Sequence, residues 1–332
     1  MILVTGATGL VGSHLLLHLL QQGAESIRAI YRNTQSIAKT KHVFELHQAL
    51  TLFESIQWQQ ADILDLPALE DAFEGITHVY HCAAMVSFDP RHEKILRKTN
   101  IEGTANIVNL CLAHSIEKLC HISSIAALGE SLHYSTPITE QTEWNPALYH
   151  SDYALSKFGG EMEVWRGTQE GLDVVIVNPG VIFGRGFYRE GSSELFYKVH
   201  QGFPFYTTGT TAVVSVEDVV SAMYQLMESE HKNERYILVS DNLKNRELLH
   251  YIAALLQKKP ASFEIGPFGL ALAWRLDAFV SILTRKKRSF TRAIAKASFS
   301  CFIYDASKIE QTLDFTFSSY QKFLVDVSKG FK

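Results

Sequence analysis

The chain contains 332 residues, which is enough for two domains or for one large unit of mixed helices and strands. Its composition is 46 % hydrophobic and 20 % charged, so a disordered, collagen-like or mucin-like protein is excluded. The 31 basic residues are outnumbered by 35 acidic residues, and the net charge is −4. Because no basic field is available to attract phosphate backbones, we expect no nucleic-acid partner.

The cysteines and the apolar segments favour a cytoplasmic protein. No cysteine belongs to a CxxC pair or has zinc-type spacing with histidines, which argues against a disulfide framework and a structural metal. The four cysteines are Cys82, Cys111, Cys120 and Cys301. The chain begins on a short apolar run without the features of a signal peptide, so we expect no export signal. The longest apolar stretch, 265–274, is interrupted by Arg275 and is too short to span a membrane.

Short β-rich runs alternate with amphipathic stretches in the first half of the chain. The predicted strands are 2–5, 26–31, 56–61, 78–81, 118–123 and 174–177. Apolar stripes predict helices over 10–22, which ends at Gly23, and over 91–114. Alternation of this kind, with right-handed crossovers, predicts an α/β fold with a doubly wound parallel sheet, the Rossmann arrangement.

The amino-acid composition changes after Pro179, and residues 181–207 are rich in glycine and aromatic side chains. A strand over 212–216 follows, and we interpret this segment as part of a substrate-covering region. A helix over 217–228 and a strand over 236–239 then predict a return to the sheet. We therefore assign 1–180 and 208–240 to the Rossmann domain. Residues 181–207 and 241–332 are assigned to a smaller, mostly helical domain that covers the substrate.

A glycine-rich loop separates the first predicted strand from the first predicted helix. Glycines at this place allow a pyrophosphate to approach the backbone, and the helix N-terminus supplies N–H donors. The predicted contacts with a dinucleotide are Gly6, Thr8, Gly9, Leu10, Val11 and Gly12.

The end of the second predicted strand selects the cofactor. An acidic residue at this place binds the ribose hydroxyls of NAD, whereas this chain has Tyr31 followed by Arg32. A guanidinium binds a 2′-phosphate through charge-assisted hydrogen bonds, so we expect NADP, with NAD as the alternative. The competing interpretation is that Arg32 is a solvated surface charge.

Tyr153 and Lys157 are four residues apart, so a helix places the phenol and the ammonium on one face. A carbonyl that receives hydride develops negative charge on oxygen, which a tyrosine of lowered pKa neutralises by donating its proton. Ser124, at the end of a predicted strand, would hold the substrate oxygen. Asn100 would connect Lys157 to solvent through water, although a capping or helix-bending role is the alternative. The same spacing recurs at Tyr304, which lacks this frame of strands.

These residues resemble the extended short-chain dehydrogenase/reductases, in the NAD-dependent epimerase/dehydratase group. The GxxGxxG spacing, the Ser124, Tyr153 and Lys157 set, and the segment that follows Asn178 carry the resemblance over about residues 1–240, with a weaker echo over 304–315. It implies that helices 91–114 and 151–169 form a homodimer. It also implies further cofactor contacts at Asp62, Ile63, Cys82, Ala83, Ala84, Pro179, Gly180 and Val181. For Asp62 the alternative is a cap of the helix that follows Leu66.

The reaction class depends on two positions. Nucleotide-sugar enzymes of this group commonly have an arginine and a histidine where this chain has Thr211 and Ser215. The sequence is more similar to dihydroflavonol-reductase-like and 3β-hydroxysteroid-dehydrogenase-like members, which implies NADP-dependent redox chemistry on the carbonyl or alcohol of a hydrophobic or aromatic small molecule. The predicted substrate contacts are Met85, Ser124, Tyr153, Phe183 and Arg185. A nucleotide-sugar epimerase or dehydratase and a noncatalytic dinucleotide sensor are the alternatives.

Two further patterns have structural explanations. Phe268, Leu272, Leu276, Phe279 and Leu283 form a helical stripe before Arg285-Lys286-Lys287-Arg288, which is typical of a core helix but also allows contact of 265–288 with a membrane surface. His14 and His18, without a third ligand, are interpreted as helix-surface residues, and no metal is expected.

Overall fold

The computed structural model describes residues 1–130, 136–284, 288 and 290–331. Seven parallel strands form its central sheet in the order β10-β6-β5-β4-β1-β2-β3. The strands are β1 (Ile2–Thr5), β2 (Ile27–Tyr31), β3 (Gln57–Gln60), β4 (His78–His81), β5 (Lys118–Ile122), β6 (Val174–Pro179) and β10 (Glu234–Leu238). The reversal of strand order beside β1 confirms the predicted doubly wound Rossmann sheet.

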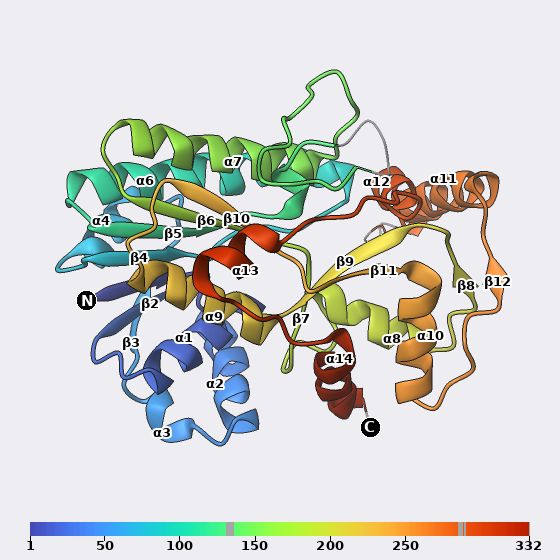
Figure 1. Cartoon of the computed structure of the whole chain (residues 1–332), viewed down its shortest axis with the longest axis horizontal. Coiled ribbons are helices and arrows are strands. Elements are labelled where there is room, and N and C mark those ends of the chain that lie inside the picture. The colour runs from blue at the N-terminus through green and yellow to red at the C-terminus, as the bar shows by residue number, and fades with distance from the viewer. Residues whose placement is uncertain (131–135, 285–287, 289, 332) are drawn as a thin grey trace.

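Helices cover both faces of this sheet (Figure 1). One face packs against α1 (Leu10–Gln21), α2 (Ile37–Leu46), α3 (Leu50–Phe53) and α9 (Val216–Glu228). The other face packs against α4 (Leu66–Phe73), α6 (Gly103–Ala113) and α7 (Asp152–Gln169). Each face has its own cluster of buried aliphatic and aromatic residues, which explains why the strands are apolar on both sides.

The predicted helix over 91–114 is interrupted. A 3₁₀ turn over residues 90–92 leads into α5 (Glu93–Arg97), a π-helical turn follows over Lys98–Glu102, and α6 completes the segment. Turns of this kind are common at functional sites because they change the phase of a helix. Here the wide turn contains Asn100.

The smaller part of the chain contains two short sheets and several helices. One sheet has the order β11-β9-β7, and the other pairs β12 with β8. Its elements are β7 (Val181–Phe183), α8 (Glu194–His200), β8 (Phe205–Tyr206), β9 (Thr210–Ser215), β11 (Asp241–Lys244), α10 (Asn245–Leu255), β12 (Phe263–Glu264), α11 (Pro267–Thr284), α12 (Arg292–Ala297), α13 (Ser307–Leu313) and α14 (Tyr320–Ser328). The strand predicted over 212–216 thus belongs to this second sheet and not to the central one, because β9 pairs with β7 and β11. Within 181–240, α9 and β10 return to the central sheet.

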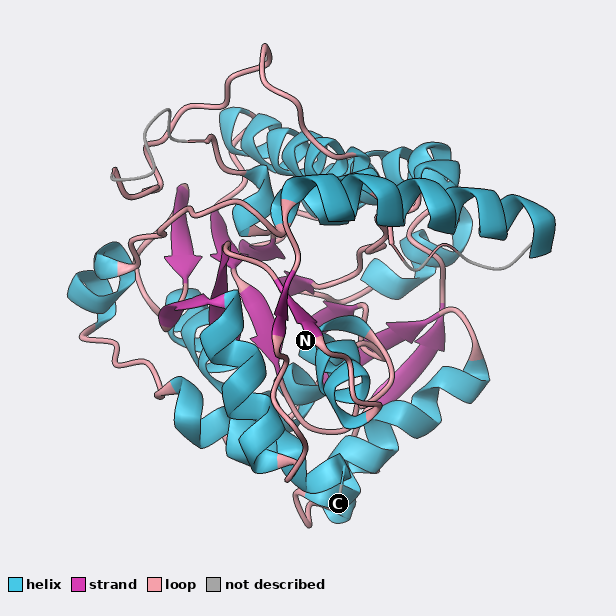
Figure 2. Cartoon of the chain, turned by 90° about the vertical axis from the view of Figure 1, so that its right-hand side faces the viewer, coloured by secondary structure: helices cyan, strands magenta, loops and turns pink. Residues whose placement is uncertain are grey.

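Helix α11 lies along the outside of the molecule (Figure 2). The interpretation of its stripe as core is wrong, because Phe268 is 86 % exposed and Leu272, Leu276 and Phe279 are each more than half exposed. The side chain of Leu283 and residues 285–287 lie outside the described part of the structure. Within that part, no helix combines the length and the apolar character that crossing a bilayer requires.

A buried carboxylate fixes α7 to the sheet. Glu161 is fully buried, and its two oxygens accept hydrogen bonds from Ser123 Oγ (2.6 Å), Asn178 Nδ2 (2.9 Å), Trp165 Nε1 (3.3 Å) and Arg235 Nη1 (2.9 Å). These partners belong to β6, β10, α7 itself and the residue after β5. Such a charge is tolerated in a core only where its lone pairs are satisfied, so this network sets the position of the helix.

Arg235→Ala should destabilise the protein strongly, because it removes the cationic partner of Glu161. A fully buried pair broken on one side costs about 3 to 5 kcal/mol, and we expect about 2 to 4 kcal/mol here because Arg235 is 19 % exposed. Lys232→Ala is the matched control, since Lys232 pairs with Asp173 at the surface and its loss should destabilise the protein much less. Urea denaturation followed by circular dichroism measures the free energy of unfolding of both variants. Equal losses of this free energy would contradict the role of Glu161.

Candidate active site

The glycine loop brings β1, β4 and α1 close together. Gly6 has φ +63°, and a Cβ there would lie 2.6 Å from the backbone of Cys82 and Ala83. A Cβ at Gly12 would lie 2.3 Å from the Gly6 carbonyl oxygen, so α1 approaches the strand at a distance that only glycine permits. At Gly9 the only close atom is the Gly6 oxygen, at 3.4 Å.

The N-terminus of α1 suits an anionic group. Its cap residue, Gly9, makes no side-chain hydrogen bond to the helix, and the first turn contains no acidic residue. The N–H groups of this turn therefore keep their capacity to donate to a phosphate, and the helix dipole favours negative charge there. Since Thr8, Gly9, Leu10 and Val11 form this end, the residues present fit the pyrophosphate of a dinucleotide.

Arg32 and Asp62 lie side by side at the ends of β2 and β3. Arg32 Nη1 is 3.9 Å from Asp62 Oδ2, and the Arg32 side chain is 72 % exposed. Asp62 Oδ1 also accepts a hydrogen bond from Leu64 N at 3.0 Å. The alternative role of Asp62 as a helix cap is wrong, because the cap of α4 is Asp65, whose side chain accepts from Ala68 N. The sequence reasoning treated Arg32 and Asp62 separately and missed this ion pair.

The residues after β4 are held by a relay of buried polar groups. Ala83 N donates to Thr5 Oγ1 (3.1 Å), and Thr5 Oγ1 contacts His81 Nδ1 (2.7 Å). His81 Nε2 lies 3.0 Å from Thr104 Oγ1, which donates to the Asn100 carbonyl oxygen (2.8 Å). Burial lowers the pKa of His81 to about 3, so the ring is neutral. This relay fixes the strand end that carries Cys82, Ala83 and the exposed Ala84.

The other expected cofactor residues differ in exposure. Ile63 is buried against α6, where Asn106 Nδ2 donates to its carbonyl oxygen at 2.9 Å. Pro179 is buried at the end of β6, whereas Val181 is exposed. A Cβ at Gly180 would lie 2.7 Å from the Ala212 carbonyl oxygen, so glycine allows β9 to pass closely there.

Ser124, Tyr153 and Lys157 come from β5 and α7. Tyr153 lies in the first turn of α7, which Ser151 caps, and Ser124 follows β5. The Ser124 side chain lies near the Tyr153 phenol; burial raises the pKa of Tyr153, and the nearby Ser124 hydroxyl opposes the shift. Lys157 Nζ donates to the Ile122 carbonyl oxygen at 2.8 Å. Burial lowers the pKa of Lys157 to about 8, while Glu161 and Cys82 act in the opposite direction.

The Asn100 side chain hydrogen bonds to the backbone of the loop that contains Met85. Its Oδ1 accepts from Met85 N (2.7 Å), and its Nδ2 donates to Met85 O (2.9 Å) and to Ser156 Oγ (2.9 Å). Among the described hydrogen bonds of its side chain, none reaches Lys157, so the expected link through water stays a prediction. The side chain of Asn100 instead holds Met85 against α7.

A cavity of about 290 Å³ lies beside the first turn of α7. Its walls are aromatic and basic, and Phe88 also contacts the Tyr153 ring with centroids 5.5 Å apart. The side chains that line it include Ser87, Phe88, Tyr149, Asp152, Trp274 and Arg292. Sequence reasoning missed these residues because they come from four segments that only the tertiary structure brings together. A larger cavity, about 410 Å³, is lined by Phe158 and Trp165 of α7 and by Arg235. Neither Ser124 nor Tyr153 lines either cavity, and the smaller one is connected to Tyr153 through the ring of Phe88.

Phe183 and Arg185 do not lie at this cavity. Phe183 is fully buried and packs against Phe196 and Phe323, so it belongs to the core of the smaller part. Arg185 interacts electrostatically with His14 and His47 on the α1 side of the sheet. Phe183 and Arg185 were predicted to contact the substrate because they follow β6 closely in the sequence. The prediction failed because the chain turns away from the cavity after Val181.

The second Tyr-x-x-x-Lys pair is structural. The Tyr304 backbone hydrogen bonds to the Asn242 side chain, and burial raises the pKa of the Tyr304 phenol. Lys308 donates to the Arg235 carbonyl oxygen and pairs with Glu234 at 2.8 Å.

Comparisons with known proteins agree with this arrangement. Residues 2–238 match the model of the NAD dependent epimerase/dehydratase family. Sterol demethylase protein B of Methylococcus capsulatus is 27 % identical over 76 % of this chain and 74 % of its own length. Cinnamoyl-CoA reductase 1 of Petunia hybrida is 26 % identical over 77 % and 78 %, respectively. A UDP-glucose 4-epimerase from Thermotoga maritima has the same fold, with TM-score 0.78 and 19 % identity over 99 % of this chain and 98 % of that one. The chain therefore belongs to the NAD-dependent epimerase/dehydratase family, and it is an NAD(P)-dependent enzyme of the extended short-chain dehydrogenase/reductase type.

Proposed function

We propose that this enzyme uses NADP to reduce the carbonyl of a hydrophobic or aromatic small molecule, or to oxidise the corresponding alcohol. The observation that carries the proposal is the placement of the Ser124 side chain near the Tyr153 phenol, with Lys157 one turn farther along α7 and an aromatic cavity whose wall residue Phe88 contacts the Tyr153 ring. The nicotinamide ring supplies or accepts the hydride when it is bound.

Ser124, Tyr153 and Lys157 each have a separate role in the reaction. The Ser124 hydroxyl holds the substrate oxygen, and the Tyr153 phenol donates its proton to that oxygen as negative charge develops there. The ordinary pKa of tyrosine is about 10 and burial raises that of Tyr153, so the phenol carries its proton at neutral pH. The buried Lys157 ammonium favours the phenolate that remains after transfer, because it brings positive charge into a water-poor site.

The cavity favours this substrate class over a nucleotide sugar. Phe88, Tyr149 and Trp274 offer ring surfaces for an apolar substrate. At the positions where nucleotide-sugar enzymes commonly have an arginine and a histidine, Thr211 hydrogen bonds to Asn245 (2.7 Å) and Ser215 caps α9. The names of the sterol- and cinnamoyl-CoA-related proteins agree with an apolar substrate.

The proposal extends to the cofactor and to partners. NADP is favoured over NAD because the exposed Arg32 guanidinium can leave the long contact with Asp62 for a 2′-phosphate. A homodimer through α5, α6 and α7 is supported by the exposed Ile95 and Met162 on these helices. A cytoplasmic location with membrane-surface contact of α11 is the remaining expectation from the sequence.

Tyr153→Phe should lower the rate of hydride transfer at least about 100-fold, because the substrate oxygen loses its proton donor. Tyr304→Phe is the matched control, since this phenol belongs to the second, structural motif and its loss should leave the rate nearly unchanged. Single-turnover measurements of NADPH oxidation give both rates. If the two variants exchanged these outcomes, the active site would lie at the Tyr304 motif and not at the Tyr153 motif.

Arg32→Ala should reduce most of the preference for NADPH over NADH. The lost charge-assisted contact is worth about 1.5 to 3 kcal/mol, or roughly 10- to 100-fold in affinity. Lys322→Ala removes an exposed charge on α14 and should leave the preference unchanged. Calorimetric titration with both cofactors measures the effect, and tighter binding of NADH by the unmodified protein would refute the assignment.

A ligand panel tests the substrate class. In the presence of NADP, hydrophobic and aromatic ketones or alcohols should raise the melting temperature and support turnover, whereas UDP- and dTDP-sugars should do neither. Trp274→Ala should weaken binding of the active compounds by removing a cavity wall. Saturable stabilisation by a UDP-sugar, with no response to any apolar carbonyl, would favour the epimerase alternative.

A further inference from the structure

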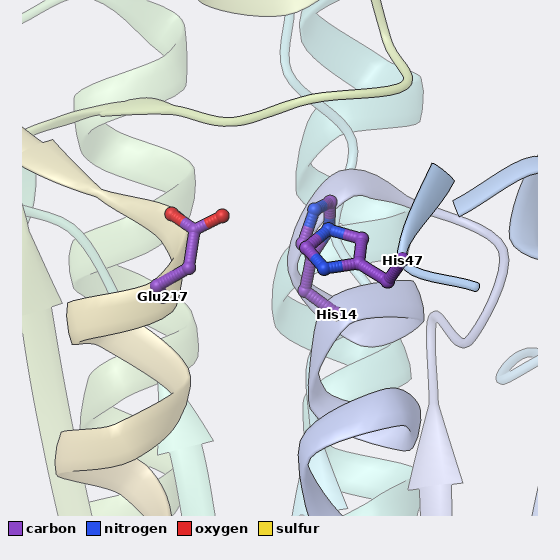
Figure 3. A group of neighbouring side chains, drawn as sticks. All are labelled: His14, His47 and Glu217. Carbon is purple, nitrogen blue, oxygen red and sulfur yellow. The ribbon is translucent and has the colours of Figure 1, made fainter. Parts of the chain in front are cut away.

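Two histidines and a glutamate meet on the α1 side of the sheet. His14 lies in α1, His47 follows α2 and Glu217 opens α9. One ligand atom from each residue lies within 4.8 Å of the other two. Figure 3 shows the two imidazole rings close together, with the Glu217 carboxylate turned toward them from α9. The interpretation of His14 as a helix-surface residue that pairs with His18 is wrong, because His14 is buried and its neighbour is His47.

The hydrogen bonding of His14 leaves one nitrogen ready to bind a cation. Its Nδ1 donates to the Leu10 carbonyl oxygen at 2.8 Å, because a carbonyl can only accept. The neutral ring then has its lone pair on Nε2, which is buried and has no hydrogen-bond partner in the described structure. Metal-binding histidines characteristically donate their other nitrogen to a backbone carbonyl in this way. His47 Nε2 is likewise buried without a partner.

The charged groups around the cluster bear on whether a cation or an anion is the ligand. Arg185 Nε is buried without a hydrogen-bond partner in the described structure, so an anion held by this guanidinium is the competing ligand. Arg185 would repel a cation, but Glu217 is itself a ligand and the carboxylate of Asp326 also acts on His47. Asp326 is shared with Lys329 at the surface. Burial raises the pKa of Glu217 to about 7, so a bound cation would displace the proton that remains there near neutral pH. The two unpartnered imidazole nitrogens and the carboxylate then form a ligand set that suits a metal.

We propose that His14, His47 and Glu217 bind a divalent transition-metal ion of the zinc class. Two imidazoles and one carboxylate form a ligand set that Zn²⁺ accepts, with water in the fourth position. In a tetrahedral site the ligand atoms lie about 3.4 Å apart, so small side-chain rotations suffice. Glu217 is exposed, which gives the ion and its water a path of entry. The ion would connect α1, the end of α2 and the start of α9 beneath the glycine loop.

The test uses full-length protein without a histidine tag. Zn²⁺ binding is measured by competition with a chromophoric chelator, and Co²⁺ substitution reports geometry through its visible absorption. We expect one ion per chain, with a tetrahedral Co²⁺ spectrum. His47→Gln and Glu217→Gln should each weaken binding at least about 10-fold, since even loss of a group that only orients a ligand costs 10- to 100-fold. His18→Gln, on the same helix as His14, is the matched control and should bind like the unmodified protein.

Independent measurements separate loss of the site from loss of the fold. Glu217→Gln changes an exposed side chain, and its circular dichroism and NADPH affinity without metal should match those of the unmodified protein. Equal Zn²⁺ affinity in this variant, in His47→Gln and in the unmodified protein would overturn the proposal. A rise in melting temperature with inorganic phosphate but not with Zn²⁺ would overturn it as well, in favour of an anion held by Arg185.

Discussion

The buried carboxylate of Glu161 is the interaction on which the rest of the site depends. It draws donors from β6, β10, α7 and the residue after β5 into one network, so that α7 can lie against the sheet in only one position. Tyr153 and Lys157 belong to this helix, and Ser124 is next to a residue of the same network. An unsatisfied charge in the core would cost several kcal/mol, so helix and strand ends move together or not at all.

The carboxyl edge of the parallel sheet explains why residues far apart in sequence meet. Thr5, Arg32, Asp62, Ala83 and Ser124 each end or follow a strand of this sheet. In a doubly wound sheet these ends face the crevice where ligands bind, so one layer of backbone positions both the cofactor and the reacting groups. Helices α11 and α12 add walls to the neighbouring aromatic cavity through Trp274 and Arg292.

Much of the fold could be predicted because its determinants are local. The alternation of short apolar runs with helical stripes predicted the six strands of the first half within one or two residues, and glycine spacing located the phosphate loop. The partner of β9 was not predictable, since a strand of the same pattern fits either sheet. The apolar stripe of α11 was wrongly interpreted as core for a related reason. Periodicity shows that a helix has an apolar face but not what covers that face.

In the candidate site, too, residues in local motifs could be predicted, whereas residues placed by long-range packing could not. Short motifs predicted Ser124, Tyr153 and Lys157, which the structure places at the end of β5 and in α7, whereas Phe183 and Arg185 were assigned from their place in the sequence and lie elsewhere. Glu161 carried no signal beyond its spacing of one helical turn from Lys157. Its role depends on Arg235 and Asn178, which reach it only through long-range packing.

The π-helical turn at Lys98–Glu102 has a consequence for how this segment can evolve. Each residue of an α-helix turns the chain by about 100°, so the wide turn sets the rotational phase of everything that follows. Upstream of it the chain faces the solvent at Ile95, and downstream it buries Val108 against the sheet. Deleting a single residue here would rotate α6 by about 100° and turn its buried side chains away from the sheet, so the length of this segment is under tighter constraint than the identity of most of its side chains.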